Sequence, residues 1–116
     1  MTFSSERSVN SMAERVSKSD FAEKVLNFPG LALVDFYSDT CVPCKRMVPV
    51  ITAVESDYPE GLLVAKVNVA FDSELVEEYN VTSAPTFLFF KNGEEVERFS
   101  GVLKKDELEA KINSHL

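Results

Sequence analysis

Residues 31–49 read LALVDFYSDTCVPCKRMVP, an apolar run followed by a polar turn and a Cys-x-x-Cys pair. The near-continuous apolar run predicts a strand that is covered on both faces. Past the cysteines, large apolar residues recur at helical spacing at Met47, Val50, Ile51 and Val54, which predicts a helix. This segment is therefore expected to fold as a strand, a turn that carries a dithiol, and a helix.

The two cysteines, Cys41 and Cys44, fall at the predicted start of this helix. Pro43 suits the first turn, because its missing N–H leaves no helical bond unmade. The unpaired amides and the positive end of the helix dipole favour an anion there, so a thiolate at Cys41 is stabilised relative to the thiol. Cys44 lies on the same face one turn further into the helix, close enough to bridge. We interpret Cys41 as the exposed nucleophile and Cys44 as the more shielded resolving thiol.

The chain resembles the thioredoxin family in residues that span most of its length. The matching residues are Val34-Asp35-Phe36-Tyr37, Cys41-Val42-Pro43-Cys44-Lys45, Pro49, Lys66, Ala84-Pro85-Thr86 and Asn92-Gly93. A Cys-x-x-Cys by itself is a weak signal, but a preceding Asp-bearing strand and a later Pro-Thr pair make it a strong one. Two positions depart from the family, since Thr40 replaces the usual Trp before the first Cys and Val42 replaces the usual Gly between the cysteines.

Strands alternating with helices, closed by a hairpin and a last helix, predict an α/β sheet with parallel and antiparallel parts. The resemblance implies the thioredoxin fold, a central mixed five-stranded sheet flanked by four helices, with the dithiol just past the end of a strand. Catalytic groups are expected at that place in open α/β sheets. Residues 12–116 are expected to form this single domain. Residues 1–11, rich in Ser and poor in large apolar residues, are expected to be a flexible N-terminal extension.

Local signals predict the remaining elements. One helix is expected to begin at a cap on Ser19 or Asp20, and a short one at a cap on Asp72 or Ser73. The expected later features are a left-handed Asn80, strands over residues 62–69, 86–90 and 94–100, a two-residue hairpin at Asn92-Gly93, and a last helix marked by Leu108, Ile112 and Leu116. Pro49 lies inside the helix that follows the dithiol and is expected to kink it.

Composition narrows the classes of function. The chain has 116 residues, is 45% hydrophobic and carries a formal net charge of −7 with no basic block. One domain with a single core is therefore expected, and nucleic acid and anionic membranes are poor partners for it. The sequence has no apolar run of about 18 residues that could span a membrane, and its N-terminus lacks the apolar segment of a secretory signal. We expect a cytoplasmic monomer.

Two other uses of the cysteine pair are disfavoured. A purely structural disulfide is disfavoured in the cytoplasm, where a Cys-x-x-Cys is more often catalytic or metal-binding. Zinc is disfavoured because two cysteines and one histidine, His115, cannot supply the usual four ligands without a dimer or carboxylates. His115 is expected to be a frayed surface residue. We expect no metal and no organic cofactor, and a redox-active disulfide between Cys41 and Cys44.

Asp35 stands in the middle of an apolar strand and is expected to be substantially buried. Burial raises the pKa of a carboxyl group, which suits a group that exchanges protons near neutrality. In thioredoxins the matching Asp lies behind the resolving Cys and assists its deprotonation, with a nearby Lys that Lys66 matches. The alternative is an Asp on a strand position turned outward, because buried Asp is rare unless it is paired.

The resemblance also implies substrate-binding positions. X–Pro bonds are cis in only ~5–6% of cases, but the thioredoxin Pro that matches Pro85 is cis and packs against the dithiol. The residue before it, here Ala84, offers backbone hydrogen bonds to an extended substrate, which is peptide recognition by strand addition. Thr40, Val42 and Pro43 flank or separate the cysteines and are also expected to bind substrate. Thr40, which lacks the usual aromatic surface, is expected to affect docking, and Val42 is expected to affect the redox potential.

Thiol–disulfide exchange needs a thiolate that attacks a target disulfide and a second thiol that displaces the reduced product. The leading hypothesis is a cytoplasmic protein-disulfide reductase in which Cys41 attacks and Cys44 resolves. The resemblance implies thioredoxin reductase, a flavoprotein, as its electron donor and disulfide-containing proteins as its substrates. Two alternatives stay open: an oxidant or isomerase with a less reducing potential, and a thioredoxin-like adaptor without turnover.

Overall fold

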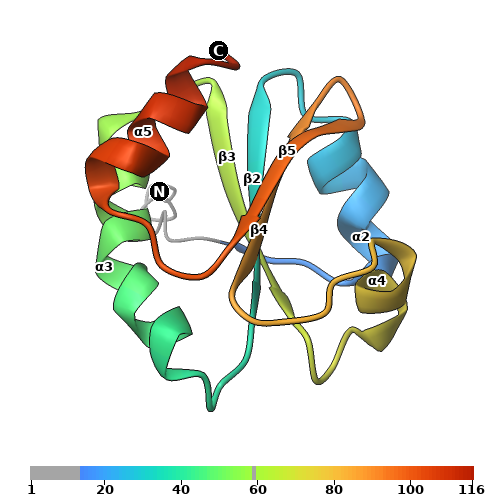
Figure 1. Cartoon of the computed structure of the whole chain (residues 1–116). Coiled ribbons are helices and arrows are strands. Elements are labelled where there is room, and N and C mark those ends of the chain that lie inside the picture. Colours follow the sequence, from blue (N-terminus) through green and yellow to red (C-terminus); the bar gives the residue numbers. More distant parts are fainter. Residues whose placement is uncertain (1–13, 59) are drawn as a thin grey trace, which may run out of the picture.

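Five strands form one mixed sheet, and helices cover both of its faces (Figure 1). The computed structural model describes residues 14–58 and 60–116. The strands are β1 (Glu14–Arg15), β2 (Leu31–Tyr37), β3 (Leu62–Asn68), β4 (Thr86–Lys91) and β5 (Glu94–Ser100). In the order β1-β3-β2-β4-β5, the first three strands run parallel to one another, and β4 pairs antiparallel with both β2 and β5.

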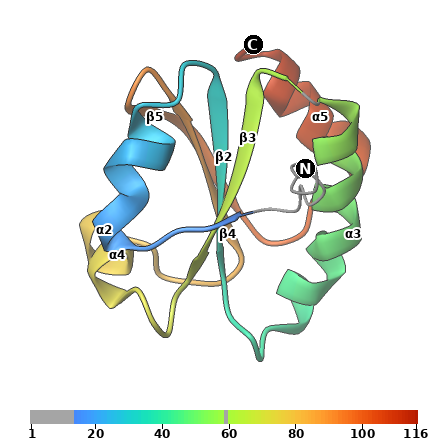
Figure 2. The same cartoon turned by 180° about the vertical axis from the view of Figure 1, so that it is seen from behind.

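Within the described residues, four α-helices flank the sheet. They are α2 (Lys18–Phe21), which continues as the π-helix η2 (Ala22–Leu26), α3 (Val42–Asp57), α4 (Ser73–Glu78) and α5 (Lys105–Asn113). The helices α2 and α4 cover one face and α3 and α5 the other, as the two opposite views show (Figures 1 and 2). The predicted α/β fold, a five-stranded mixed sheet with four helices, is confirmed.

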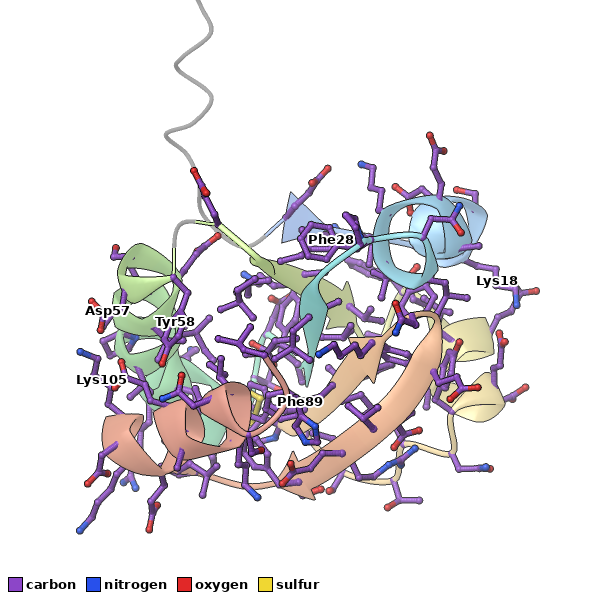
Figure 3. All side chains as sticks on the ribbon, turned by 90° about the horizontal axis from the view of Figure 1, so that it is seen from above. Lys18, Phe28, Asp57, Tyr58, Phe89 and Lys105 are labelled. Carbon is purple, nitrogen blue, oxygen red and sulfur yellow. A yellow bond between two sulfur atoms is a disulfide. The ribbon has the colours of Figure 1, made fainter. Side chains whose placement is uncertain are left out.

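Side chains fill both spaces between the sheet and the helices (Figure 3). One core cluster joins β2 and β4 to Phe21 of α2 and Leu75 of α4, and the other joins them to Met47 of α3 and Leu108 of α5. An ion pair of 2.8 Å between Asp57 and Lys105 also links the end of α3 to the start of α5. Each face of the sheet therefore has its own core.

Strand β2 is central and buried on both faces, because helices cover it from both sides. Residues 31–36 are each at most 8% exposed. Successive side chains of a strand point to opposite faces. Ala32, Val34 and Phe36 accordingly belong to the cluster under α2 and α4, and Leu31 and Leu33 to the cluster under α3. Asp35, two places after Leu33, therefore also faces α3. It is the only charged residue in β2.

The predicted turn residues adopt the backbone conformations that their sequences favour. Asn92 and Gly93 have φ angles of 55° and 82°, and positive φ at both central positions is what a two-residue type I′ hairpin needs. Asn80, just after α4, has φ 55° and is left-handed as predicted. Asp72, one of the two candidate caps, is the N-cap of α4.

Some expected boundaries were wrong. The first helix is capped by Ser17 and not by Ser19 or Asp20. The Asp20 carboxylate instead accepts a hydrogen bond of 2.7 Å from the Ser17 N–H, which is the reciprocal half of a capping box. The last helix, α5, ends at Asn113, so that Leu116 lies outside it and is 56% exposed.

The remaining expectations concern β1, Pro49, the N-terminal residues and membrane-spanning helices. The short strand β1 was not predicted, because two residues are too few for a periodic pattern. Pro49 lies inside α3, and the helix continues past it to Asp57. The extension expected over residues 1–11 lies outside the described residues. None of the helices in the described part of the chain is both long and apolar enough to cross a lipid bilayer.

The expectation for His115 was also wrong. Its Nε2 lies 2.7 Å from Oε1 of Glu97, and its ring centroid lies 6.2 Å from that of Phe89. Its main-chain carbonyl accepts a hydrogen bond from Lys91. His115 is partly buried because α5 packs its C-terminal end against β4 and β5, so it is not frayed.

Candidate active site

The dithiol lies where β2 passes into α3. Cys41 is the N-cap of α3, and a disulfide joins it to Cys44, with 5.2 Å between the two Cα atoms. The Cys44 N–H donates to Sγ of Cys41 over 3.1 Å. Cys41 is partly exposed, whereas Cys44 is only 6% exposed. The sequence prediction that one sulfur lies at the mouth of the helix and the other behind it therefore matches the geometry.

The turn between β2 and α3 is shaped by its own short polar side chains. The Thr40 N–H donates to Oγ of Ser38 over 3.3 Å, and the Cys41 N–H donates to the Ser38 carbonyl over 3.3 Å. Oδ2 of Asp39 accepts from Nδ2 of the buried Asn68, at the end of β3, over 3.3 Å. These bonds hold the loop in place and leave Cys41 at its accessible end.

A distant loop lies against the dithiol. The Ala84–Pro85 peptide bond is cis, and the Ala84 carbonyl oxygen lies 3.4 Å from Sγ of Cys41. This loop is fixed on both sides, because Oγ1 of Thr86 donates to the Ser83 carbonyl over 2.7 Å and the Gly101 N–H donates to the Pro85 carbonyl over 3.0 Å. Pro85 is buried and Ala84 is partly exposed, so main chain is available next to Cys41.

Asp35 lies behind the dithiol on the face of β2 that α3 covers. It is 8% exposed, and its Oδ1 atom has no hydrogen-bond partner within the described residues. Burial raises the pKa of the Asp35 carboxyl to about 7, against a smaller opposite effect of the Lys66 charge. Lys66 is its direct neighbour in the parallel register of β2 with β3. The predicted burial of Asp35 is confirmed, and the outward-facing alternative is wrong.

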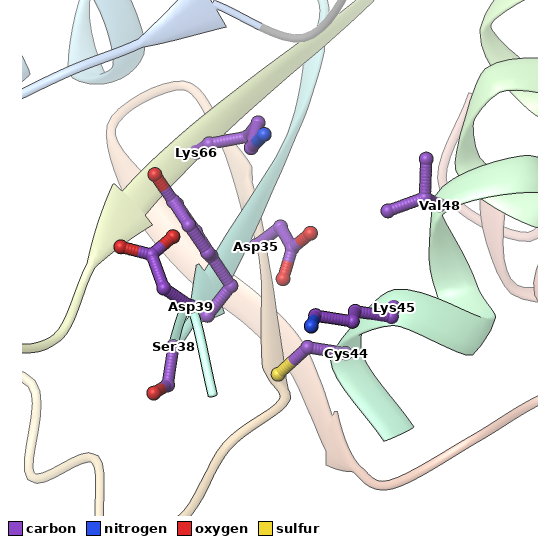
Figure 4. Close-up of a pocket in the computed structure, with 8 residues that line it drawn as sticks. Asp35, Ser38, Asp39, Cys44, Lys45, Val48 and Lys66 are labelled. Atoms are coloured by element: carbon purple, nitrogen blue, oxygen red, sulfur yellow. The ribbon is translucent and has the colours of Figure 1, made fainter. Parts of the chain in front are cut away.

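A small cavity connects this carboxylate with the less exposed cysteine. Its volume is about 160 Å³, and it is lined by Asp35, Tyr37, Ser38, Asp39, Cys44, Lys45, Val48 and Lys66. Figure 4 shows the Asp35 carboxylate between Lys66 on one side and Cys44 and Lys45 on the other. The Asp35 carboxylate and the Cys44 sulfur therefore border the same small cavity.

The model of the thioredoxin family matches residues 12–114. The chain belongs to the thioredoxin family. The thioredoxin of Chlamydia trachomatis is 38% identical over 104 residues, which cover 90% of this chain and 99% of that protein. The thioredoxin of Rickettsia bellii is 33% identical over 105 residues, 90% of this chain and all of that protein. The probable thioredoxin-2 of Caenorhabditis elegans is 37% identical over 93 residues, 80% of this chain and 64% of that protein.

Thioredoxins are thiol–disulfide oxidoreductases, and this family member carries their Cys-x-x-Cys disulfide at the start of α3. Two side chains beside the dithiol are exposed: Thr40 lies in the turn before it, and Val42, which is 60% exposed, is the first residue of α3. Pro43 is exposed beside it. The side chains that directly flank Cys41 in the sequence are therefore small or aliphatic.

The structure also adds residues to the site that the sequence analysis did not single out. Tyr37 lines the cavity because it lies two places after Asp35 on the same strand, and Val48 does so because it lies one helical turn after Cys44. Strand and helix periodicity could have found both. Asp39 is a third lining residue, held in place by the hydrogen bond that its carboxylate accepts from Asn68. No local sequence pattern indicates this bond. No group of three or more His, Cys, Asp or Glu side chains in the described part of the chain could hold a metal ion.

Proposed function

We propose that this protein reduces disulfide bonds in other proteins, with Cys41 as the attacking thiolate and Cys44 as the resolving thiol. The observation that carries this assignment is the hydrogen bond of 3.1 Å from the Cys44 N–H to Sγ of Cys41 at the N-cap of α3. A helix N-terminus and a directed N–H both favour the anionic form of the sulfur. The greater exposure of Cys41 supports the same order of events.

The reaction takes place in two exchanges, in which two electrons pass to the substrate. First, the Cys41 thiolate attacks one sulfur of the substrate disulfide, forming a mixed disulfide and releasing the other substrate sulfur as a thiolate. Second, Cys44 loses its proton and attacks Sγ of Cys41, which breaks the mixed disulfide and releases the second substrate thiolate. The protein is left with the Cys41–Cys44 disulfide, and the substrate thiolates take up protons.

Asp35 is proposed as the base that takes the Cys44 proton in the second exchange, with Lys66 as its charged neighbour. The support for this role is that Asp35 and Cys44 line the same cavity, and that burial raises the pKa of the carboxyl to about 7. A base acts best when its pKa lies near the working pH, because it is then both ionised and able to hold a proton. Lys66 favours the ionised form and keeps that pKa from rising further.

The substrate is proposed to lie along Ala84 and Pro85. The Ala84 carbonyl oxygen is 3.4 Å from Sγ of Cys41, so the residues beside a substrate cysteine bound to Cys41 would meet this main chain and could add to it as a strand. Thr40, Val42 and Pro43 would form the opposite side of the binding surface. Their small and aliphatic side chains favour contacts with apolar substrate segments over ionic ones.

The remaining features of the proposal follow from the family. A flavoprotein of the thioredoxin reductase type would return electrons to the Cys41–Cys44 disulfide, and the protein would act as a monomer in the cytoplasm. A reduction potential near −270 mV would support the reductase assignment, and one of about −120 to −180 mV would assign an oxidant or isomerase instead. Failure to reduce insulin in the presence of a chemical reductant would leave only a non-catalytic adaptor.

The direct test is to trap the mixed disulfide. In a Cys44→Ser variant the first exchange can occur but the second cannot, so incubation with insulin should give a covalent adduct through Cys41 that a reductant releases. The matched control is Cys41→Ser, which keeps only the shielded Cys44 and should give no adduct. Non-reducing electrophoresis and mass spectrometry would locate the bond. An adduct with the Cys41→Ser variant alone would reverse the two roles, and none with either would reject the proposal.

A further inference from the structure

Tyr37 contacts the lysine of the proton-transfer site through its ring. It ends β2, lies two residues after Asp35 and therefore points to the same face of the sheet. Nζ of Lys66 lies over this ring, 4.6 Å from its centroid, which is within the distance of about 6 Å at which an ammonium group is attracted to an aromatic face. The ring and the carboxylate are thus two alternative partners for one ammonium group.

Lys66 does not pair with the carboxylate beside which it lies. The two residues are register partners in β2 and β3, yet within the described residues the structure has no ion pair between them, and Oδ1 of Asp35 has no hydrogen-bond partner. An unpartnered buried carboxylate oxygen is costly. The contact that the structure gives the Lys66 ammonium in place of this ion pair is the one with the Tyr37 ring.

We propose that Tyr37 is a positioning residue for the reaction: its ring holds the Lys66 ammonium near Asp35 without letting the two form a salt bridge, so that the carboxylate stays able to take the Cys44 proton. This inference rests on the proposed role of Asp35 as the base for Cys44. A carboxylate paired directly with a lysine would stay ionised and be a poor proton acceptor. The aromatic face attracts the ammonium without competing for the proton.

Other charged groups face the same cavity. Lys45 reaches it from α3 and Asp39 from the turn after β2, while the neighbour of Asp35 on β4 is the apolar Phe87. Lys45 and Asp39 are both exposed, so water screens their effect on the buried carboxylate. Among the residues that the structure describes, Lys66 is the one whose charge lowers the pKa of Asp35, against the larger effect of burial. The position of the Lys66 ammonium therefore sets how far the pKa of Asp35 is lowered from the value that burial alone would give.

The test is a pH titration of the Asp35 carboxyl carbon by NMR in the full-length oxidised protein. In wild type the group should be half protonated near pH 7. Tyr37→Phe keeps the aromatic face and should leave this midpoint unchanged. Tyr37→Leu removes the face, so Lys66 should move onto the carboxylate and the proton affinity of Asp35 should fall about tenfold. If Tyr37→Leu does not fold, Tyr37→Met fills the same space with a flexible apolar side chain and serves as the second variant.

A second pair of variants shows whether the shift of the Asp35 midpoint in Tyr37→Leu depends on Lys66. Lys66→Gln alone should raise the midpoint, because it removes a positive charge near the carboxylate. With Lys66→Gln already present, Tyr37→Leu should cause no further shift, which is a double-mutant cycle on the titration. A purely structural role of Tyr37 would instead shift the midpoint equally in both backgrounds, and that result would overturn the proposal.

The other outcomes are equally decisive. An unchanged or higher midpoint in Tyr37→Leu would show that the ring does not hold Lys66 off the carboxylate, and the proposal would fail. The titration needs no substrate and no turnover. A wild-type protein that failed to reduce disulfides would therefore reject the proposed function, whereas the titration alone decides whether Tyr37 controls the position of Lys66.

Discussion

Asp35 and Glu97 are carboxylates on two strands of the same sheet, but their surroundings change their pKa in opposite directions. Asp35 is buried in the central strand β2, and burial raises its pKa to about 7. Glu97 lies on the edge strand β5, where its hydrogen bonds to Lys111 and His115 hold its pKa below its usual value. One carboxylate is desolvated and incompletely paired, and the other is partly exposed and paired twice.

The difference shows that the same side-chain group can serve stability at one place in the sheet and proton transfer at another. A carboxylate that accepts hydrogen bonds from Lys111 and lies beside His115 has a lowered pKa, so it stays ionised at neutral pH and can hold α5 against β5. A buried carboxylate with an unpartnered oxygen costs folding free energy but can bind and release a proton near pH 7. The two regions therefore predict opposite responses to the same kind of substitution, in which the carboxylate is replaced by its amide.

The largest expected effect is that of Asp35→Asn on stability. The pKa of Asp35 is raised in the folded protein, so its contribution to stability is fully present below the unfolded pKa of about 4 and is lost as pH rises through about 7. A difference of about three pH units corresponds to about 4 kcal/mol. Urea unfolding of the oxidised proteins should show Asp35→Asn gaining about this much on wild type between pH 4 and pH 8. A difference that does not change with pH would contradict the buried, proton-binding state of Asp35.

The next effect concerns the rate of the second exchange. Asp35→Asn should slow resolution by Cys44 about a hundredfold at neutral pH, which is typical of losing a general base, while attack by Cys41 changes much less. In wild type the resolution rate should rise with pH through about 7, and in the variant this rise should be absent. Single-turnover measurements of mixed-disulfide formation and decay separate the two steps.

A control from the other region sharpens this prediction. Glu97→Gln changes a carboxylate far from the dithiol in the chain and outside the residues that line the cavity, so both exchange rates should stay at their wild-type values. Equal slowing of the two steps by Asp35→Asn, or slowing of resolution by Glu97→Gln, would argue against a specific role of Asp35 in deprotonating Cys44.

The smallest expected effect is that of Glu97→Gln on stability. The pKa of Glu97 is lowered in the folded protein, so its contribution is present above the unfolded pKa and is lost as pH falls through the folded one. Because the side chain is partly exposed, the loss at neutral pH should be about 0.5–1 kcal/mol and should disappear in acid. Urea unfolding checks it, with Glu94→Gln on the same strand as the matched control. A gain in stability of Glu97→Gln at neutral pH would mean that the contacts of Glu97 with Lys111 and His115 do not stabilise the packing of α5 on the sheet.

Local patterns were enough to predict much of the fold. The apolar run before Cys41, the helical spacing after Cys44 and the Asn92-Gly93 pair each depend on neighbours in the chain, and each gave the correct element. The errors arose where a contact between distant segments decides the outcome. His115 looks like a terminal residue in the sequence, yet Glu97 and Phe89 hold it on the sheet. Ser17 was missed as the cap because Asp20, its capping-box partner, is itself a good cap.

The sequence by itself determined that a dithiol stands at the start of a helix and that an acid, Asp35, lies within a buried strand, because both follow from short-range periodicity and burial. Only the tertiary structure decided what surrounds them. The register of β2 with β3 places Lys66 beside Asp35, and the packing of α3 on the sheet places Cys44 over the same cavity. The return of the chain at Ala84 brings main chain to Cys41. These segments are far apart in sequence, so their meeting depends on strand pairing and core packing, which no local pattern encodes.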